Sequence, residues 1–85
     1  MPSAGAKPLS DMKPGEQRVI TELTIQGTMR RRLLDLGFIP GATVKMLRRS
    51  PLGDPAAFMV NRTVIALRKE ESSQIFGMPT PSERG

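Results

Sequence analysis

Proline and glycine interrupt this chain so often that only short helices and strands fit between them. Eight of its 85 residues are Pro and eight are Gly. Two interruptions share one form, Lys13-Pro14-Gly15 and Ile39-Pro40-Gly41, and residues 50–55 contain two further prolines. Each Pro lacks a backbone donor and restrains the residue before it, which predicts turns at the first two places and a shaped loop at the third.

One segment has a helical pattern, and we expect a helix over residues 28–36. Thr28 can cap its start, and Gly37 can end it in the left-handed conformation. At about 100° per residue, one face collects apolar side chains and the opposite face polar ones. The apolar face holds Met29, Leu33, Leu34 and Leu36, and the polar face holds Arg31, Arg32 and Asp35. We expect the apolar face to join the core, with Leu34 at its margin available for a contact.

The remaining pattern is that of about five short strands. Val19, Thr21 and Leu23 alternate with Arg18, Ile20 and Glu22 in a first strand over residues 17–23. The other strands are expected around Val44 and Met46 with a bulge or an edge at Leu47, before and after Asn61-Arg62, and over residues 74–78. Single helical turns are expected at residues 9–12 and 69–73. These elements predict a mainly β fold, a small, strongly bent barrel with one short helix inserted after the first strand.

Two turns and the domain limits follow from the same segments. Pro40 and Gly41 fit the centre of a type II turn, whereas Asn61-Arg62 suits a primed hairpin turn at Asn61 but not at Arg62. Residues 1–8 and 79–85 lack periodicity, so we expect mobile tails around a folded domain over residues 9–78.

The composition argues against catalysis and against bound cofactors. The chain has no Cys, His, Trp or Tyr, and so it lacks the usual general base, the usual transition-metal ligands and the large aromatic rings that stack on bases, haem or flavin. Asp54 is a lone carboxylate, and Glu70, Glu71 and Glu83 would hold a divalent cation only weakly and adventitiously. We therefore expect a protein that is not an enzyme and has no intrinsic cofactor. It also has no apolar run long enough to cross a membrane, which suggests a cytoplasmic protein.

The charge leaves several kinds of partner open. Thirteen Lys and Arg residues against eight Asp and Glu residues give a net charge of +5, and the pI is near 10.8. Arg30, Arg31 and Arg32, with Lys45, Arg48 and Arg49, could contact nucleic-acid phosphates, could meet an acidic protein surface, or could simply keep the helix solvated. Without an aromatic platform or a nucleic-acid-binding motif, we expect no nucleic-acid partner and keep a nucleic-acid-binding barrel as the alternative.

Four segments, in order and spacing, resemble the ferrous iron transport protein A family (FeoA). They are Leu33-Leu34-Asp35-Leu36-Gly37-Phe38-Ile39-Pro40-Gly41-Ala42-Thr43-Val44, Pro51-Leu52-Gly53-Asp54-Pro55, Val64-Ile65-Ala66-Leu67-Arg68, and Glu70-Glu71 through Ile75. Arg62 departs from the family, which often has Gly at this hairpin position. The same SH3-like module also ends iron- or manganese-dependent repressors, and a repressor-like module is an alternative. Since this sequence has no winged helix-turn-helix ahead of the module, we expect a free-standing one.

The resemblance implies an SH3-like barrel that regulates ferrous iron uptake beside the membrane permease FeoB, whose GTP-binding domain faces the cytoplasm. We expect the protein to contact the cytoplasmic region of FeoB through one surface made of the helix and the proline-rich loop. The residues expected at this contact are Arg30, Arg31, Leu34, Pro51, Leu52, Gly53 and Asp54. An Arg of the helix supplied to the GTPase, and weak self-association through an edge strand before Arg48, are two further hypotheses.

Overall fold

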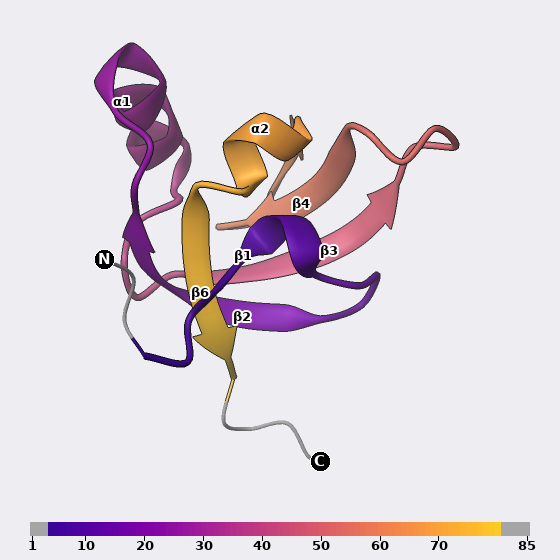
Figure 1. Cartoon of the computed structure of the whole chain (residues 1–85), viewed down its shortest axis with the longest axis horizontal. Coiled ribbons are helices and arrows are strands. Elements are labelled where there is room, and N and C mark those ends of the chain that lie inside the picture. Colours follow the sequence, from indigo (N-terminus) through magenta and orange to yellow (C-terminus); the bar gives the residue numbers. More distant parts are fainter. Residues whose placement is uncertain (1–3, 81–85) are drawn as a thin grey trace.

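The computed structural model describes residues 4–80, which form one antiparallel six-stranded sheet with helices packed on it (Figure 1). The strand order is β1-β6-β2-β3-β4-β5, which makes β1 and β5 the two edges. The strands are β1 (Lys7–Pro8), β2 (Gln17–Leu23), β3 (Thr43–Arg49), β4 (Ala56–Val60), β5 (Thr63–Leu67) and β6 (Ile75–Pro79). The helices are the 3-10 turn η1 (Leu9–Asp11), α1 (Gly27–Leu36) and α2 (Lys69–Ser72). The mainly β fold with a helix after the first long strand is confirmed.

The sheet curves around a single apolar core to which all the longer strands contribute (Figure 1). Its fully buried side chains come from the strands, from η1 and the residue after it, from α1, and from the second residue beyond the end of α1. The largest are Phe38, Phe58, Leu9, Met12, Ile20, Leu33, Met46, Ile75, Val44 and Val60. Burial of these side chains is the main favourable contribution to folding in a chain of this size.

Both central strands contain an irregularity. Of the bulge or edge predicted at Leu47, the bulge is confirmed, because the pairing of β3 with β4 shifts between Met46 and Arg48. The edge strand expected before Arg48 is wrong, because β3 lies between β2 and β4. In β2 a shift between Ile20 and Glu22 was not predicted. It exchanges the faces of the strand, so that the buried residues are Arg18 and Ile20 before the shift and Leu23 after it. The uniform alternation expected for this strand is therefore wrong.

Helix α1 begins one residue earlier than expected and ends where expected. Thr28 lies inside the helix, and no side chain caps its start, so the predicted Thr28 cap is wrong. Gly37 ends the helix with a φ of 115°, in the left-handed region that favours glycine. The next residue, Phe38, donates its N–H to Leu33 O over 3.0 Å and is fully buried, which fixes the direction of the chain after the helix.

The predicted turns are confirmed. Ala42 donates its N–H to Ile39 O over 3.0 Å, and Gly41 has a φ of 95°, as the type II turn at Pro40-Gly41 requires. Between β4 and β5, Asn61 and Arg62 have φ values of 52° and 64°. Both positive values are those of a primed turn, so Arg62 adopts a conformation that its side chain disfavours.

The folded part extends beyond the expected limits at both ends. Lys7 and Pro8, expected in a tail, pair with Gly77 and Phe76 of β6, and they add the sixth strand. Pro79, also expected in a tail, is the last residue of β6. Residues 1–3 and 81–85 of the two expected tails lie outside the described residues. Within residues 4–80, no helix has the length and apolar character that crossing a membrane would require.

Candidate functional site

The solvent-facing side of α1 brings the three predicted helix residues together. Arg30, Arg31 and Leu34 line an open hollow of about 430 Å³, together with Gly27 and Asp35. These positions are three or four residues apart, which places them on one side of a helix. The hollow therefore combines an apolar side chain with charges of both signs.

Arg30 and Arg31 have different surroundings within this hollow. Arg30 is half-buried, and its Nη1 donates to Leu23 O over 2.8 Å, which ties α1 to the end of β2. Arg31 is exposed and makes no ion pair with any residue between 4 and 80. Arg31 is therefore the cation that a partner can reach, whereas Arg30 also holds the helix in place.

The loop over residues 50–55 presents Leu52 to solvent on a constrained backbone. Leu52 is 93% exposed. Gly53 donates its N–H to Ser50 O over 2.8 Å, and Ser50 donates to Pro55 O over 3.0 Å. The carboxylate of Asp54 accepts the N–H of Lys69, the first residue of α2, over 2.8 Å. Asp54 therefore anchors the loop to α2.

The structure does not bring the helix and the loop together. Helix α1 lies at one end of the long axis of the molecule, and the loop between β3 and β4 lies at the other end (Figure 1). The expectation of one continuous contact surface made by both segments is therefore wrong. The sheet separates them, so the two segments are two surfaces that can be tested independently.

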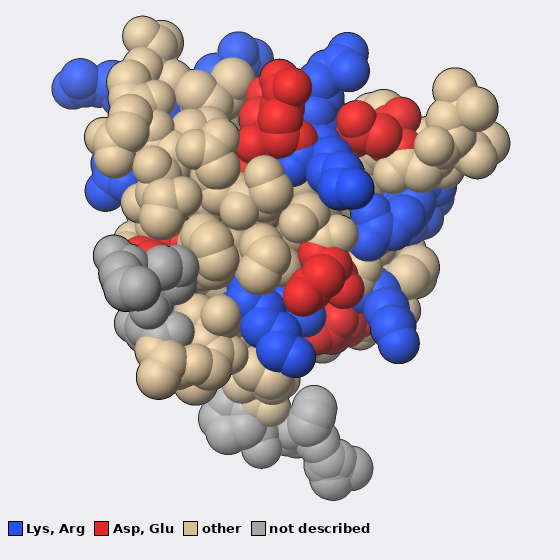
Figure 2. Space-filling model, in the orientation of Figure 1, with Lys and Arg blue, Asp and Glu red and all other residues tan. Residues whose placement is uncertain are grey.

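The basic residues do not form one patch on the face shown in Figure 2. Lys and Arg side chains alternate there with Asp and Glu side chains. Arg49 also turns inward, since its Nη2 donates to Ser10 O over 3.0 Å and to Met12 O over 2.8 Å. Two of the six basic side chains singled out in the sequence, Arg30 and Arg49, thus bind backbone carbonyls. This weakens the nucleic-acid alternative, which needs cations free to face phosphates.

The most enclosed charge cluster was missed by the sequence analysis. The buried guanidinium of Arg18 lies 2.7 Å from Asp11 Oδ1 and 2.8 Å from Glu16 Oε2, and it donates to Pro8 O over 3.0 Å. Burial raises the pKa of Glu16, but the N–H of Lys13 and the guanidinium of Arg18 outweigh it and lower that pKa below 4.5. The cluster joins β1, η1 and β2, and its role is structural.

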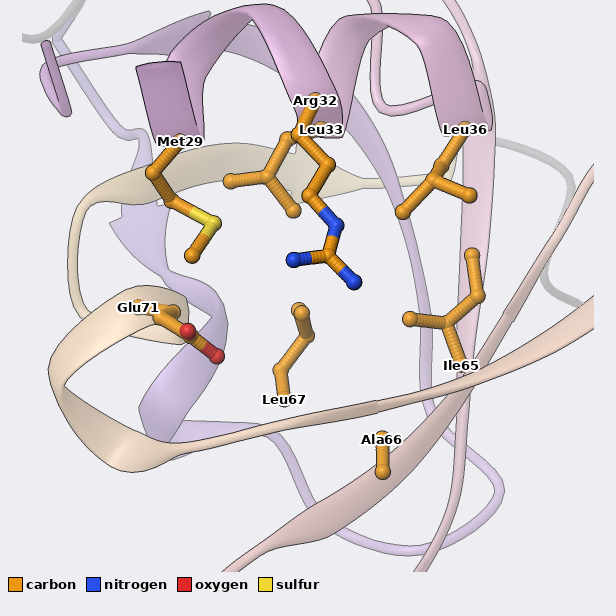
Figure 3. Close-up of a pocket in the computed structure, with 8 residues that line it drawn as sticks. All are labelled: Met29, Arg32, Leu33, Leu36, Ile65, Ala66, Leu67 and Glu71. Atoms are coloured by element: carbon orange, nitrogen blue, oxygen red, sulfur yellow. The ribbon is translucent and has the colours of Figure 1, made fainter. Parts of the chain in front are cut away.

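A second hollow lies between α1 and the edge strand β5 (Figure 3). It measures about 120 Å³ and is lined mostly by apolar side chains of the two elements. Only Leu33 of the apolar helix face is fully buried, whereas Met29 and Leu36 are half-buried and border this hollow. The sequence suggested core packing for the whole stripe, and the part that remains accessible was not anticipated.

No metal centre is evident in the part of the chain that the structure describes. Residues 4–80 contain no group of three or more acidic side chains close enough to hold a metal ion. Asp54, the carboxylate considered in the sequence, instead accepts the backbone hydrogen bond of Lys69.

Comparison with known proteins places this fold in a family. The FeoA domain model matches residues 7–79. The chain belongs to the FeoA domain family. A solution structure of FeoA from Chlorobium tepidum is 35% identical, with 89% of this chain and 73% of that chain covered and a TM-score of 0.81. Zinc-complexed FeoA from Stenotrophomonas maltophilia, described as a prokaryotic SH3 domain protein, is 29% identical, with 80% and 85% covered and a TM-score of 0.72.

A curated relative joins a FeoA segment to a transporter. It is the Fe(2+) transport protein A/Fe(2+) transporter FeoB fusion protein of Porphyromonas gingivalis, which is 33% identical over 67 residues. The match covers 79% of this FeoA-family chain and 8% of the fusion protein. A manganese-dependent transcriptional repressor aligns with a TM-score of 0.81 at 14% identity, which shows the shared SH3-like fold alone. The family and its SH3-like fold, both expected from the sequence, are thus confirmed, and so is the association of the family with ferrous iron transport.

Proposed function

We propose that this FeoA-family chain is a cytoplasmic accessory protein of ferrous iron uptake that acts by binding the cytoplasmic part of a FeoB permease, without chemistry of its own. The observation that carries the proposal is the fusion protein, in which a related segment and a FeoB transporter share one chain. Segments fused in one organism often correspond to proteins that bind each other in another. The absence of Cys and His further favours binding over catalysis.

The solvent-facing side of α1 is the better of the two predicted contact surfaces. It offers an open hollow in which exposed Arg31 lies beside half-buried Leu34. An apolar contact surrounded by accessible charge is a common arrangement at protein interfaces, where the charge contributes to partner choice and association rate. The loop offers one exposed apolar side chain, Leu52, and no residue of the loop lines the hollow on α1 or the hollow beside β5.

Calorimetric titration of the FeoB cytoplasmic region from the same organism tests the proposal. We expect saturable binding, and we expect Arg31→Glu to weaken it by about tenfold, because the change reverses an accessible charge at the contact. Arg48→Glu is the matched control, since it makes the same charge change on an exposed residue of β3. It should leave the affinity within about twofold.

Each negative result has a distinct meaning. A lack of saturable binding by the unmodified chain would overturn the function. Equal losses for Arg31→Glu and Arg48→Glu would show that net charge, and not the α1 surface, governs binding. Leu52→Ser tests the loop separately, because it keeps Asp54 and its bond to Lys69. A loss caused by Leu52→Ser alone would move the contact to the other end of the molecule.

A further inference from the structure

Within residues 4–80, no strand lies beyond β5 in the sheet. It is the last strand in the order and pairs only with β4. The two-residue turn makes Val60 and Thr63 a hydrogen-bonded pair. From that pair on, hydrogen-bonded and non-hydrogen-bonded pairs alternate along the two antiparallel strands. Thr63, Ile65 and Leu67 therefore bond to β4, while the N–H and C=O groups of Val64 and Ala66 face away from it.

The outward-facing groups of β5 stay open to a partner strand. No turn, loop or cap hydrogen bond between described residues involves the backbone of Val64 or Ala66. Both residues are exposed, and Val64 is 58% exposed although it is apolar. An unpaired strand edge is a template for an additional strand, and an extended peptide binds there through main-chain hydrogen bonds.

Helix α1 adds a place for the side chains of such a strand. Met29 and Leu36 of the helix lie across the 120 Å³ hollow from Ile65 and Leu67 of β5 (Figure 3). Side chains of an added strand alternate in direction, so every second one would point into this hollow. Apolar side chains at those positions would be buried between α1 and the sheet.

The charged side chains around β5 determine which kind of added strand can bind there. Arg62 and Arg68 lie just before and just after β5, and both are exposed. Arg32 extends from α1 into the hollow (Figure 3). None of the three forms an ion pair within residues 4–80. The acid that lines the hollow, Glu71, already accepts the N–H of Arg68 over 2.9 Å.

A second copy of the chain fits this edge poorly. In the antiparallel register that pairs the whole of two β5 strands, centred on Ile65, Val64 of one copy would face Ala66 of the other. In that register Arg62 of each copy would face Arg68 of its partner. Like charges directly opposite each other destabilise a strand pair. Acidic residues at the same two positions would be attracted instead.

We propose that the open edge of β5 binds an extended segment of a partner protein that is apolar in its middle and carries an acidic residue at each end, six positions apart. The inference rests on the proposed function only in assigning the segment to a protein partner. It does not depend on the α1 surface that contains Arg31, nor on the identity of the permease.

A synthetic peptide tests this edge directly. The probe is a capped seven-residue peptide with Glu at both ends and alternating Val and Thr between them. The control peptide has the same middle residues and Lys at both ends. In a titration at low ionic strength, we expect the Glu-ended peptide to bind and to slow amide exchange at Val64 and Ala66 by about tenfold or more. The Lys-ended peptide should bind at least about fivefold more weakly.

A charge pair can be tested in the same titration. Antiparallel pairing places the first residue of the peptide opposite Arg68. Arg68→Gln should weaken the Glu-ended peptide about threefold, and it should have no effect on a peptide with Gln at its first position. Arg48→Gln, the matched control on β3, should change neither affinity.

Three outcomes would overturn the proposal. They are unchanged exchange at Val64 and Ala66 at saturating peptide, equal binding of the Glu-ended and Lys-ended peptides, and a dimer of the chain alone that protects these two amides. The last outcome would make the occupant a second copy. Failure of FeoB binding, by contrast, would leave the peptide result intact, so the two proposals fail separately.

Discussion

Arg18 illustrates how one residue can connect three segments of a small fold. Its place in a strand suggests an exposed charge, yet the guanidinium is buried against Asp11, Glu16 and the carbonyl of Pro8. A buried charge is tolerated when ion pairs and hydrogen bonds compensate for lost hydration. All of these partners lie in or next to β1, η1 and the start of β2, so Arg18 holds the beginning of the fold together.

Stability should fall in acid partly through Glu16. Its pKa in the folded protein lies below the ordinary value of 4.5, so its carboxylate stabilises the fold above about pH 4.5. That contribution is lost as the pH falls through the folded-state pKa. Urea unfolding between about pH 7 and pH 3 should show Glu16→Gln losing less stability than the unmodified chain.

Glu70→Gln is the control for this pH dependence. Glu70 is exposed on α2 and makes no ion pair within the described residues. Its substitution should leave the acid dependence of the unfolding free energy close to that of the unmodified chain. If Glu16→Gln and the unmodified chain lost stability in parallel, Glu16 would not contribute to the acid sensitivity.

At this scale the sequence predicts backbone conformation better than side-chain partners. Gly37 and Gly41 were predicted correctly because their conformation depends on immediate neighbours. The partners of Arg49 and Asp54 are 37 to 39 and 15 residues away. No local pattern encodes contacts at such separations, and the long-range bonds of these side chains were therefore missed.

The turn of the hairpin between β4 and β5 can be changed so that the fold becomes more stable. Arg62 has a φ of 64°, which costs a residue with a side chain about 1 kcal/mol relative to glycine. We expect Arg62→Gly to stabilise the fold by up to about 1 kcal/mol and to raise Tm by several degrees. Thermal unfolding followed by circular dichroism measures the change.

Arg48→Gly provides the comparison for the hairpin. It removes the same side chain from an exposed position inside β3, where glycine weakens a strand. Its Tm should fall. A lower Tm for Arg62→Gly as well would mean that the Arg62 side chain makes a favourable interaction larger than the backbone cost.

Elements with a clear repeating pattern were predictable, and elements without one were not. The range of β2 follows from its run of β-favouring residues, although its two faces exchange at the bulge, and the end of α1 follows from the terminal glycine. The two-residue strand β1 has no pattern at all, and it forms because β6 offers an edge to pair with. The apolar stripe of α1 was expected in the core, but the helix covers the sheet only partly and leaves the hollow beside β5.

The limits of the whole domain can be tested by shortening it. A chain that begins at Leu9 lacks β1 and the Pro8 carbonyl that accepts from Arg18. Loss of a hydrogen bond to a buried charge costs about 2 kcal/mol. We therefore expect the unfolding free energy, measured with urea, to fall by at least about that amount.

The matched variant begins at Lys7 and keeps both β1 and the Pro8 carbonyl. It should be nearly as stable as the full chain. Equal stability of the two shortened chains would show that β1 contributes nothing, and Leu9 would then be the start of the domain, as the sequence predicts.

At the scale of the molecule, the extended strand β3 explains why one predicted surface became two. The sequence gives residues that suit a contact on α1 and in the loop over residues 50–55. Strand β3 runs from the end of the molecule that holds α1 to the end that holds the loop, so the two lie apart (Figure 1). The residue types were therefore predictable, and their grouping was not.

The pairing of Lys7 with Gly77 brings the beginning and the end of the fold to the same corner of the sheet. A second coding sequence joined in frame upstream or downstream would thus be tethered at nearly one point. In either gene order, the linker would attach to the same corner of the domain.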